Sequence, residues 1–156
     1  IELRAWVAAQ RHMGFEMDPR ELDDHEATVL RDVTSWWKEN RSWMRDADIL
    51  RLDTCDPSEI AEQQLARDGC RFVVFAAKTH TSPQIAPRPL RLTQLDPDAH
   101  YRVSLRNRNE AGELSRGVLA LKEGPVTLSG AALMHHGLTL PWRFPATMWV
   151  LEGERL

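Results

Sequence analysis

The sequence predicts a mainly β protein in which an α/β segment, residues 1–45, precedes an antiparallel β-sandwich, residues 46–156. Helical spacing of apolar residues is confined to the first part of the chain. After it, short alternating segments recur roughly every eight to twelve residues, as in all-β domains. The pair Asp68-Gly69 stands between two of these segments and is typical of a hairpin turn. These observations place the boundary between the two parts near Asp46.

The composition is that of a folded globular protein. The chain has 156 residues, of which 42% are hydrophobic and 28% are charged, so it can bury a core. Basic and acidic residues are interspersed and the net charge is −3, so we expect no nucleic-acid partner. No apolar run approaches the roughly 20 residues of a membrane-spanning helix, and no signal peptide is visible. We therefore expect no membrane partner.

Two cysteines, Cys55 and Cys70, are too few for a disulfide framework in a chain of this size. They also lack the spacing of metal ligands, so we expect two buried free thiols in a reduced, cytoplasmic setting. No cofactor is expected.

The first ten residues are predicted to form a helix, because Leu3, Trp6, Val7 and Gln10 follow helical spacing. No capping residue precedes them, and the chain begins with Ile1. We therefore expect the chain to be part of a longer protein.

Residues 12–17 alternate apolar and polar positions, which predicts a short strand that Pro19 ends. A long helix is predicted next, with Asp23 as its N-cap and Glu26 completing a capping box. This helix ends near Met44, and it is expected to bury a face that bears Trp36, Trp37 and Trp43. A helix, a strand and a helix in succession are typical of an α/β unit with parallel strands.

The second part is predicted to consist of short strands. Residues 63–67 and 70–77 form a predicted antiparallel hairpin around a type I′ turn at Asp68-Gly69. Residues 80–89 contain three prolines and are predicted to form a loop. Further strands are predicted at 49–52, 90–92, 101–105, 117–121 and 147–152.

Glu16 and Asp18 are the candidate catalytic residues. They lie at the C-terminal end of the strand predicted at 12–17, where α/β barrels place their working residues. A retaining glycosidase needs two carboxylates about 5 to 5.5 Å apart. The alternative is that Asp18 and Pro19 form a turn, and that Glu16 and Asp18 share a face only because residues two apart on a strand always do. This alternative is favoured.

Other functional candidates are weaker. His135 and His136 are adjacent, so on a strand they would point to opposite faces, and with His80 and His100 they do not predict a metal site. Among the six tryptophans, Trp142 follows Pro141 and is the one candidate for stacking on a sugar, although burial in a core is the more common fate of tryptophan.

Several segments resemble, in the same order, the C-terminal region of bacterial α-galactosidases of glycoside hydrolase family 36. The segments are GFEMD (14–18), WKENR (37–41), ILRL (49–52), LDPDAHYRV (95–103) and SGAALMHHGLTLP (129–141). The last is the most specific. The chain departs from the family at Arg11, where glycine is frequent, and at the loop 80–89, which has no clear counterpart.

The resemblance implies that residues 1–45 are the end of a (β/α)8 barrel and that residues 46–156 are a C-terminal antiparallel β-sandwich. It implies a parent enzyme that hydrolyses terminal α-linked galactose in oligosaccharides with retention. In this family the nucleophile is the aspartate of a Lys-Trp-Asp motif and a second aspartate is the acid/base, both on earlier barrel strands. The sequence contains no Lys-Trp-Asp. The chain alone is therefore expected to be inactive and to have a stabilising role, and the family is compatible with a homo-oligomer.

Two other functions stay open at this point. The β-sandwich could be an autonomous carbohydrate-binding module. Alternatively, the chain could be a structural or interaction module that associates through the Trp-rich face of its long helix.

Overall fold

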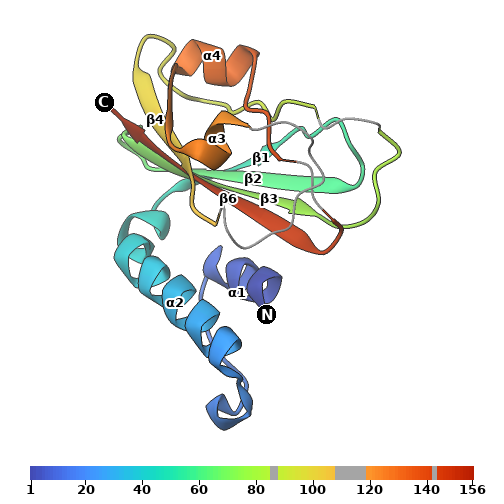
Figure 1. Ribbon diagram of the computed structural model, residues 1–156. Helices are drawn as coiled ribbons and strands as arrows, with labels where there is room; N and C mark the ends of the chain where they lie inside the picture. The colour runs from blue at the N-terminus through green and yellow to red at the C-terminus, as the bar shows by residue number, and fades with distance from the viewer. Residues whose placement is uncertain (85–87, 108–118, 142–143) are drawn as a thin grey trace. The chain divides into compact units, whose positions relative to one another are not determined.

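A computed structural model describes residues 1–84, 88–107, 119–141 and 144–156 (Figure 1). The chain divides into two compact units, Ile1–Asp46 and Ala47–Leu156. The first unit is helical and the second is built on a β-sheet.

The helical unit contains α1 (Glu2–Ala9), a short 3₁₀ helix η1 (Pro19–Glu21) and α2 (Asp24–Met44). Trp6 of α1 meets Trp36 of α2 edge to face, with ring centroids 5.2 Å apart. Both helices were predicted, and α1 buries only part of its surface. Its buried residues are Ala5, Trp6 and Ala9, whereas Val7 is 52% exposed.

The N-terminus of α2 has the predicted capping box. The Asp23 carboxylate accepts a hydrogen bond from the Glu26 N–H at 2.8 Å, and the Glu26 carboxylate accepts one from the Asp23 N–H at 3.3 Å. Two backbone donors that the first helical turn leaves unsatisfied thus find acceptors, which fixes where the helix starts.

The tryptophans of α2 are less uniformly buried than predicted. Trp36 is buried, but Trp37 and Trp43 are only partly buried. Their indole N–H groups donate to the Arg11 carbonyl and the Asn40 side chain, at 3.0 and 2.9 Å. Tryptophan has one polar atom that needs a partner, and both partly buried rings have one.

Residues 12–17 do not form the predicted strand. They are neither helical nor paired with a strand among the described residues. An alternating pattern becomes a strand only where a neighbouring strand supplies backbone partners, and the helical unit contains no sheet.

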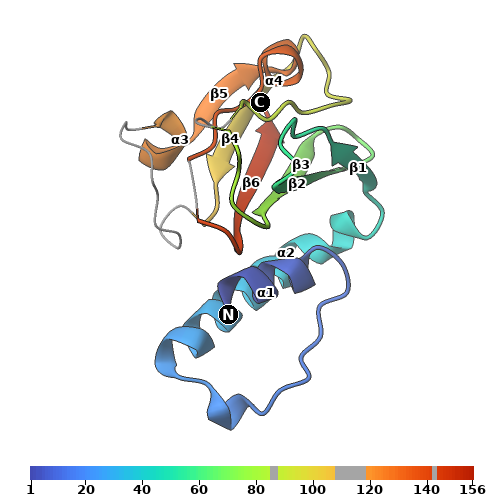
Figure 2. The ribbon, with the colours of Figure 1, turned by 90° about the vertical axis from the view of Figure 1, so that its right-hand side faces the viewer.

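The second unit is a six-stranded sheet in which every neighbouring pair is antiparallel, with the order β1-β2-β3-β6-β4-β5 (Figure 2). The strands are β1 (Asp48–Leu52), β2 (Glu59–Leu65), β3 (Arg71–Lys78), β4 (His100–Leu105), β5 (Val126–Ser129) and β6 (Thr147–Arg155). The prediction of a mainly antiparallel β architecture is confirmed.

The hairpin β2–β3 is also confirmed, but its turn is not type I′. That turn requires a positive φ at both central residues, and only Gly69 has one (+68°). The N–H of Gly69 donates to the carbonyl of Ala66 at 2.8 Å, and Ala66 N–H donates to the carbonyl of Arg71 at 2.9 Å. The connection is a longer loop built on this turn, with Gly69 supplying the left-handed position.

One face of the sheet forms the main core. Alternate residues such as Val74, Val103 and Leu151 point to this face. It is covered by the segment 88–99 and by two short helices, α3 (Ala120–Glu123) and α4 (Gly130–His135), which contribute Leu121 and Leu133. The second layer of this unit is therefore made of loops and helical turns.

Several local predictions for this layer are wrong. Residues 90–92 make a single β-bridge between Leu90 and Leu138 instead of a strand. The strand predicted at 117–121 overlaps helix α3, and its first two residues lie outside the described part of the chain. The adjacent histidines end α4 and cap it, so the argument from strand geometry does not apply to them. Leucine-rich segments of this length do not distinguish a turn of helix from a strand by pattern alone.

Two buried side-chain amides extend the hydrogen bonding of the sheet. Gln63, with no exposed surface, donates to the carbonyl of Thr93 at 2.8 Å and accepts from its N–H at 3.0 Å. Asn107 does the same for β6, donating to the carbonyl of Met148 and accepting from the N–H of Val150. Each amide satisfies backbone groups that no neighbouring strand reaches.

Candidate functional site

The predicted catalytic candidates lie between α1 and α2. Glu16 is exposed. Asp18 caps η1 by accepting from the Arg20 N–H at 3.0 Å, and its carboxylate binds the Arg20 guanidinium, with the shortest contact 2.6 Å. The hydrogen bonds from Arg20 lower the pKa of Asp18. In this chain Asp18 therefore acts as a turn and capping residue. These contacts are those expected from the alternative in which Asp18 and Pro19 form a turn.

The other residues considered from the sequence do not form a site in the described part of the chain. Trp142 lies outside the described residues. Over residues 1–84, 88–107, 119–141 and 144–156, no three His, Cys, Asp or Glu side chains gather where they could hold a metal ion. The thiols of Cys55 and Cys70 are free and exposed, so the prediction that they are buried is wrong. Both lie in connections at the ends of strands, where a small side chain need not enter the core.

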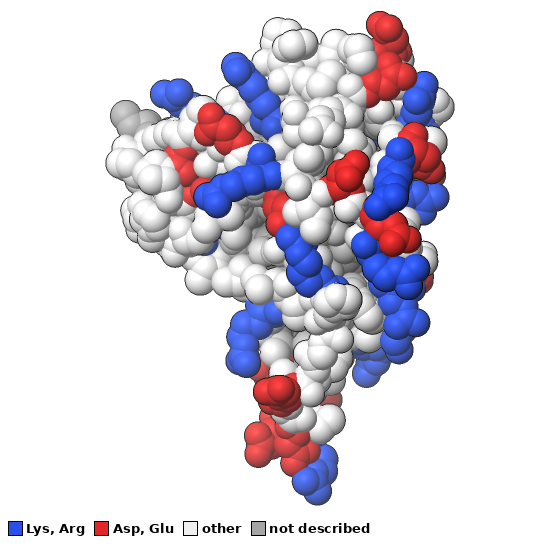
Figure 3. Space-filling view, turned by 180° about the vertical axis from the view of Figure 1, so that it is seen from behind, with Lys and Arg blue, Asp and Glu red and all other residues white. Residues whose placement is uncertain are grey.

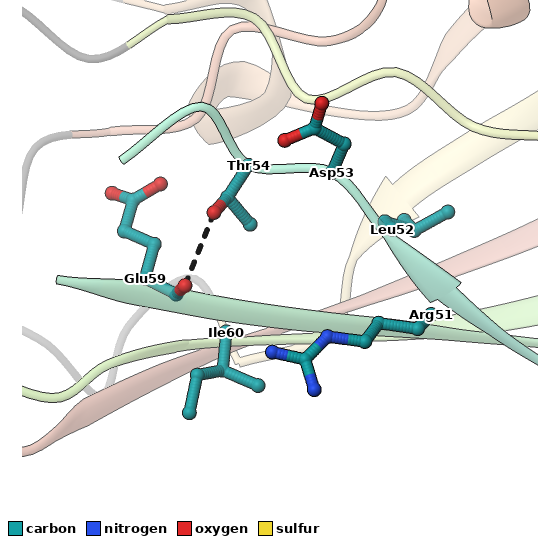
Figure 4. A pocket seen from close by; sticks show the side chains of 6 residues that line it. All are labelled: Arg51, Leu52, Asp53, Thr54, Glu59 and Ile60. Carbon is teal, nitrogen blue, oxygen red and sulfur yellow. Dashed lines mark hydrogen bonds between the residues drawn. The ribbon is translucent and has the colours of Figure 1, made fainter. Parts of the chain in front are cut away.

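The structure has an open groove where β1 ends and β2 begins, with a volume of about 390 Å³ (Figure 4). Its walls are Arg51, Leu52, Asp53, Thr54, Glu59 and Ile60. Figure 4 shows the carboxylates of Asp53 and Glu59 on one side of the strands, with Arg51 and Ile60 on the other. Thr54 bridges the two walls through its hydroxyl, which lies 3.1 Å from the carbonyl of Glu59.

Both carboxylates of the groove have partners within the fold. Asp53 accepts from the N–H of Cys55 at 2.9 Å, a local turn contact. Glu59 lies 3.5 Å from the ammonium of Lys78. The groove is thus lined by groups that shape the connection between β1 and β2.

Beside this groove lies a buried polar cluster, Asp56, Ser58 and Lys78, whose members are 6%, 0% and 4% exposed. One oxygen of Asp56 accepts from the N–H and the hydroxyl of Ser58, at 2.9 and 2.7 Å. Lys78 donates to the Ser58 hydroxyl at 3.2 Å, and its ammonium lies 3.8 Å from the other Asp56 oxygen. Ser82 also donates to that second oxygen, at 2.5 Å.

The environment of Asp56 holds it as a carboxylate. Burial by itself raises the pKa of this carboxyl, because it disfavours the charged form. The hydrogen bonds from Ser82 and Ser58 and the positive charge of Lys78 act in the opposite sense and are larger together, so the pKa of Asp56 is lowered. The buried charge of Asp56 is thus compensated by an ion pair and by hydrogen bonds.

Charges of both signs are interspersed on the face of the molecule shown in Figure 3. None of the helices in the described part of the chain is long and apolar enough to cross a membrane.

Comparison with known proteins gives the family. The sequence pattern of the Glycosyl hydrolase family 36 C-terminal domain matches residues 59–151, more than half of the chain. The chain belongs to this family. The match runs from the start of β2 into β6, so the family 36 C-terminal domain includes the hairpin, the layer over the core and both central strands.

A curated relative of this family 36 chain is the α-galactosidase of Escherichia coli, which is 25% identical over 161 residues. That alignment covers 99% of the chain but only 23% of the E. coli enzyme. The family 36 chain thus spans about a quarter of the length of this relative.

Solved structures have the same fold. The family 36 α-galactosidase AgaB from Geobacillus stearothermophilus has a TM-score of 0.77 at 20% identity, covering 99% of this chain and 19% of AgaB. The galactosidase domain of the α-galactosidase-sucrose kinase AgaSK also has a TM-score of 0.77, at 21% identity, and covers 98% of this chain and 19% of that chain. A variant of AgaA from Geobacillus stearothermophilus, solved with raffinose, has a TM-score of 0.76 at 19% identity, with 98% and 19% coverage.

Sequence reasoning missed the Asp56 cluster entirely. Asp56-Pro57-Ser58 has the composition of a turn, and Lys78 at the end of β3 has that of a solvated strand end. One signal could have revealed it. The apolar run of β3 ends at Lys78, and a lysine buried there needs a buried carboxylate to compensate its charge.

Proposed function

We propose that this chain is the C-terminal part of an α-galactosidase and that its role is to stabilise the catalytic barrel. The supporting observation is that relatives match nearly all of the chain, whereas the chain matches only 19–23% of each of the enzymes described above. In this proposal residues 1–45 end the (β/α)8 barrel and residues 46–156 are the C-terminal domain. The parent is a bacterial, cytoplasmic retaining glycosidase.

The proposed substrates of the parent are oligosaccharides with a terminal α-linked galactose. Variants of AgaA have been solved in complex with raffinose and with stachyose, which supports this class of substrate. The nucleophile and the acid/base would be supplied by barrel strands other than the segment 12–17. Within a completed barrel, Glu16 and Asp18 would lie at its mouth.

This proposal is tested by assaying the chain on a chromogenic α-galactoside. We expect no turnover above the buffer blank, because the sequence contains no Lys-Trp-Asp. The E. coli α-galactosidase serves as the positive control. Any turnover by the purified chain would contradict the proposal, and its loss in an Asp18→Asn, Glu16→Gln variant would assign that turnover to these two carboxylates.

The assay is paired with a binding measurement that addresses the alternative function. Tryptophan fluorescence is recorded while raffinose is added to millimolar concentration. We expect no saturable change. A saturable change that disappears in Trp142→Ala would instead favour an autonomous carbohydrate-binding module.

A further inference from the structure

The segment that follows β3, residues 79–84, is attached to the rest of its unit by polar contacts. At its start, the Thr79 N–H donates to the carbonyl of Ser58 at 2.8 Å. Further along, Ser82 donates to Asp56, and the side chain of Gln84 donates to the carbonyl of Cys55 at 2.8 Å. All three contacts reach the connection between β1 and β2.

The same segment contributes nothing to the apolar core. Its sequence, Thr-His-Thr-Ser-Pro-Gln, contains no large aliphatic or aromatic side chain. None of its residues is buried, and only Ser82 and Gln84 are partly covered. A segment with few apolar contacts opens at a lower free energy than the strands beside it.

Asp56 is the anchor of this attachment. Its first oxygen is occupied by Ser58 within its own connection, which leaves the second for Ser82 and for the ammonium of Lys78. The contact with Ser82 joins a neutral donor to a carboxylate, a class of hydrogen bond stronger than those between neutral groups. The Ser82 hydroxyl also accepts from the Gln84 N–H at 2.9 Å, so it orders the end of the segment as well.

We propose that residues 79–84 form a strap that Asp56 holds closed and that opens locally while the sheet stays folded. Opening breaks the contacts of Ser82 and Gln84 with Asp56 and Cys55, and so frees the connection whose ends, Asp53, Thr54 and Glu59, line the groove. The strap is thereby a device that controls the order of that groove. This inference does not depend on the function proposed above.

The pH response follows from the charges around Asp56. The groups that face it are Ser58, Ser82 and Lys78, and Lys78 is shared with Glu59. Because the folded-state pKa of Asp56 is lowered, its contribution to strap closure is present above the ordinary aspartate value of about 3.9 and is lost as pH falls through the folded value. The strap stays closed at neutral pH and opens only in acid. His80 is the other titratable side chain of the strap.

The test is amide hydrogen exchange on the full chain, comparing wild type with Ser82→Ala. At neutral pH we expect the amide of Thr79, which donates to the Ser58 carbonyl when the strap is closed, to exchange about tenfold faster or more in the variant, since hydrogen bonds to charged groups contribute more than neutral ones. Exchange in β3 is expected to be unchanged. The matched control is Thr81→Ala, an exposed hydroxyl in the same segment, which should exchange like wild type.

Two outcomes would overturn the strap. One is equal protection of the Thr79 amide in Ser82→Ala, Thr81→Ala and wild type. The other is faster exchange of β3 together with the strap, which would mean that the segment opens only when the sheet unfolds. In wild type, the ratio of strap to β3 protection should fall only in acid. A fall at mildly acidic pH that disappears in His80→Gln would assign the response to His80 and contradict the role of Asp56.

Discussion

Gly153 of β6 lies directly beneath the ring of Phe72. A Cβ at this position would overlap three carbon atoms of that ring. Phe72 is 1% exposed and also packs against Tyr101, with ring centroids 5.9 Å apart, so it has little room to move. The absence of a side chain at position 153 is what allows this aromatic pair to fill the core.

We therefore predict that Gly153→Ala destabilises the protein by about 1–3 kcal/mol, the usual cost of overpacking a core. The measurement is the midpoint of urea unfolding followed by tryptophan fluorescence. Gly124→Ala is the control, because a Cβ there has no atom within 4 Å and the backbone is extended. Equal midpoints for Gly153→Ala and Gly124→Ala would mean that the Phe72 ring shifts at no cost.

Single residues also show which parts of the structure can be predicted from sequence. The Asp23–Glu26 capping box was predicted because its partners are three residues apart. Gln63 and Thr93 are 30 residues apart, and Asp56 and Ser82 are 26 apart. Pairs of the second kind depend on the register of distant segments, and no local pattern encodes them. For the same reason, neither the groove nor the Asp56 cluster could be predicted from the sequence, and both are visible only in the folded structure.

Among the elements, helix α2 has the most complete set of local signals. It begins at its predicted cap, spans 21 residues and buries Val29, Val33 and Trp36 on one face. The strands β1, β4 and β6 were predicted near their observed bounds because they alternate. The short β5 and the one-turn helices were missed, since four to six residues are too few to establish a period.

We predict that Asp23→Ala reduces the stability of α2 by about 1 kcal/mol, because the Glu26 N–H loses its acceptor and the box is broken. Hydrogen exchange of the first turn of α2 is the direct measurement. Asp32→Ala removes an exposed carboxylate from the middle of the same helix and should leave the first turn unchanged. The prediction fails if both variants protect the first turn as wild type does.

At the scale of the whole molecule, the main core of the sheet unit is formed by residues of that unit. In the described part of the chain, its 19 buried members all lie between Leu52 and Leu151. The helical unit has only 46 residues, and chains this short rarely bury enough surface to be stable alone. The boundary predicted from the sequence, near Asp46, rests on the change in the period of the apolar residues at that point.

We accordingly predict that residues 47–156, expressed alone, unfold cooperatively in urea, and that residues 1–46 alone do not. Dispersed amide resonances and a sigmoidal transition for the first fragment are the expected readouts. Residues 47–146, which lack β6, are the control and should not fold. A non-cooperative transition for residues 47–156 would mean that the sheet unit requires more of the chain than its own core.

The order of the strands has a consequence for synthesis. β6 pairs with β3 on one side and with β4 on the other, so it joins the two halves of the sheet. While the ribosome is still translating residues 147–155, the hairpin β2–β3 can form. The strands β4 and β5 cannot yet join this hairpin in the sheet, because β6, which lies between β3 and β4, is missing. The facing edges of β3 and β4 then remain open until the last strand emerges. In the living cell, these two edges are where a nascent chain would need protection from pairing with its neighbours.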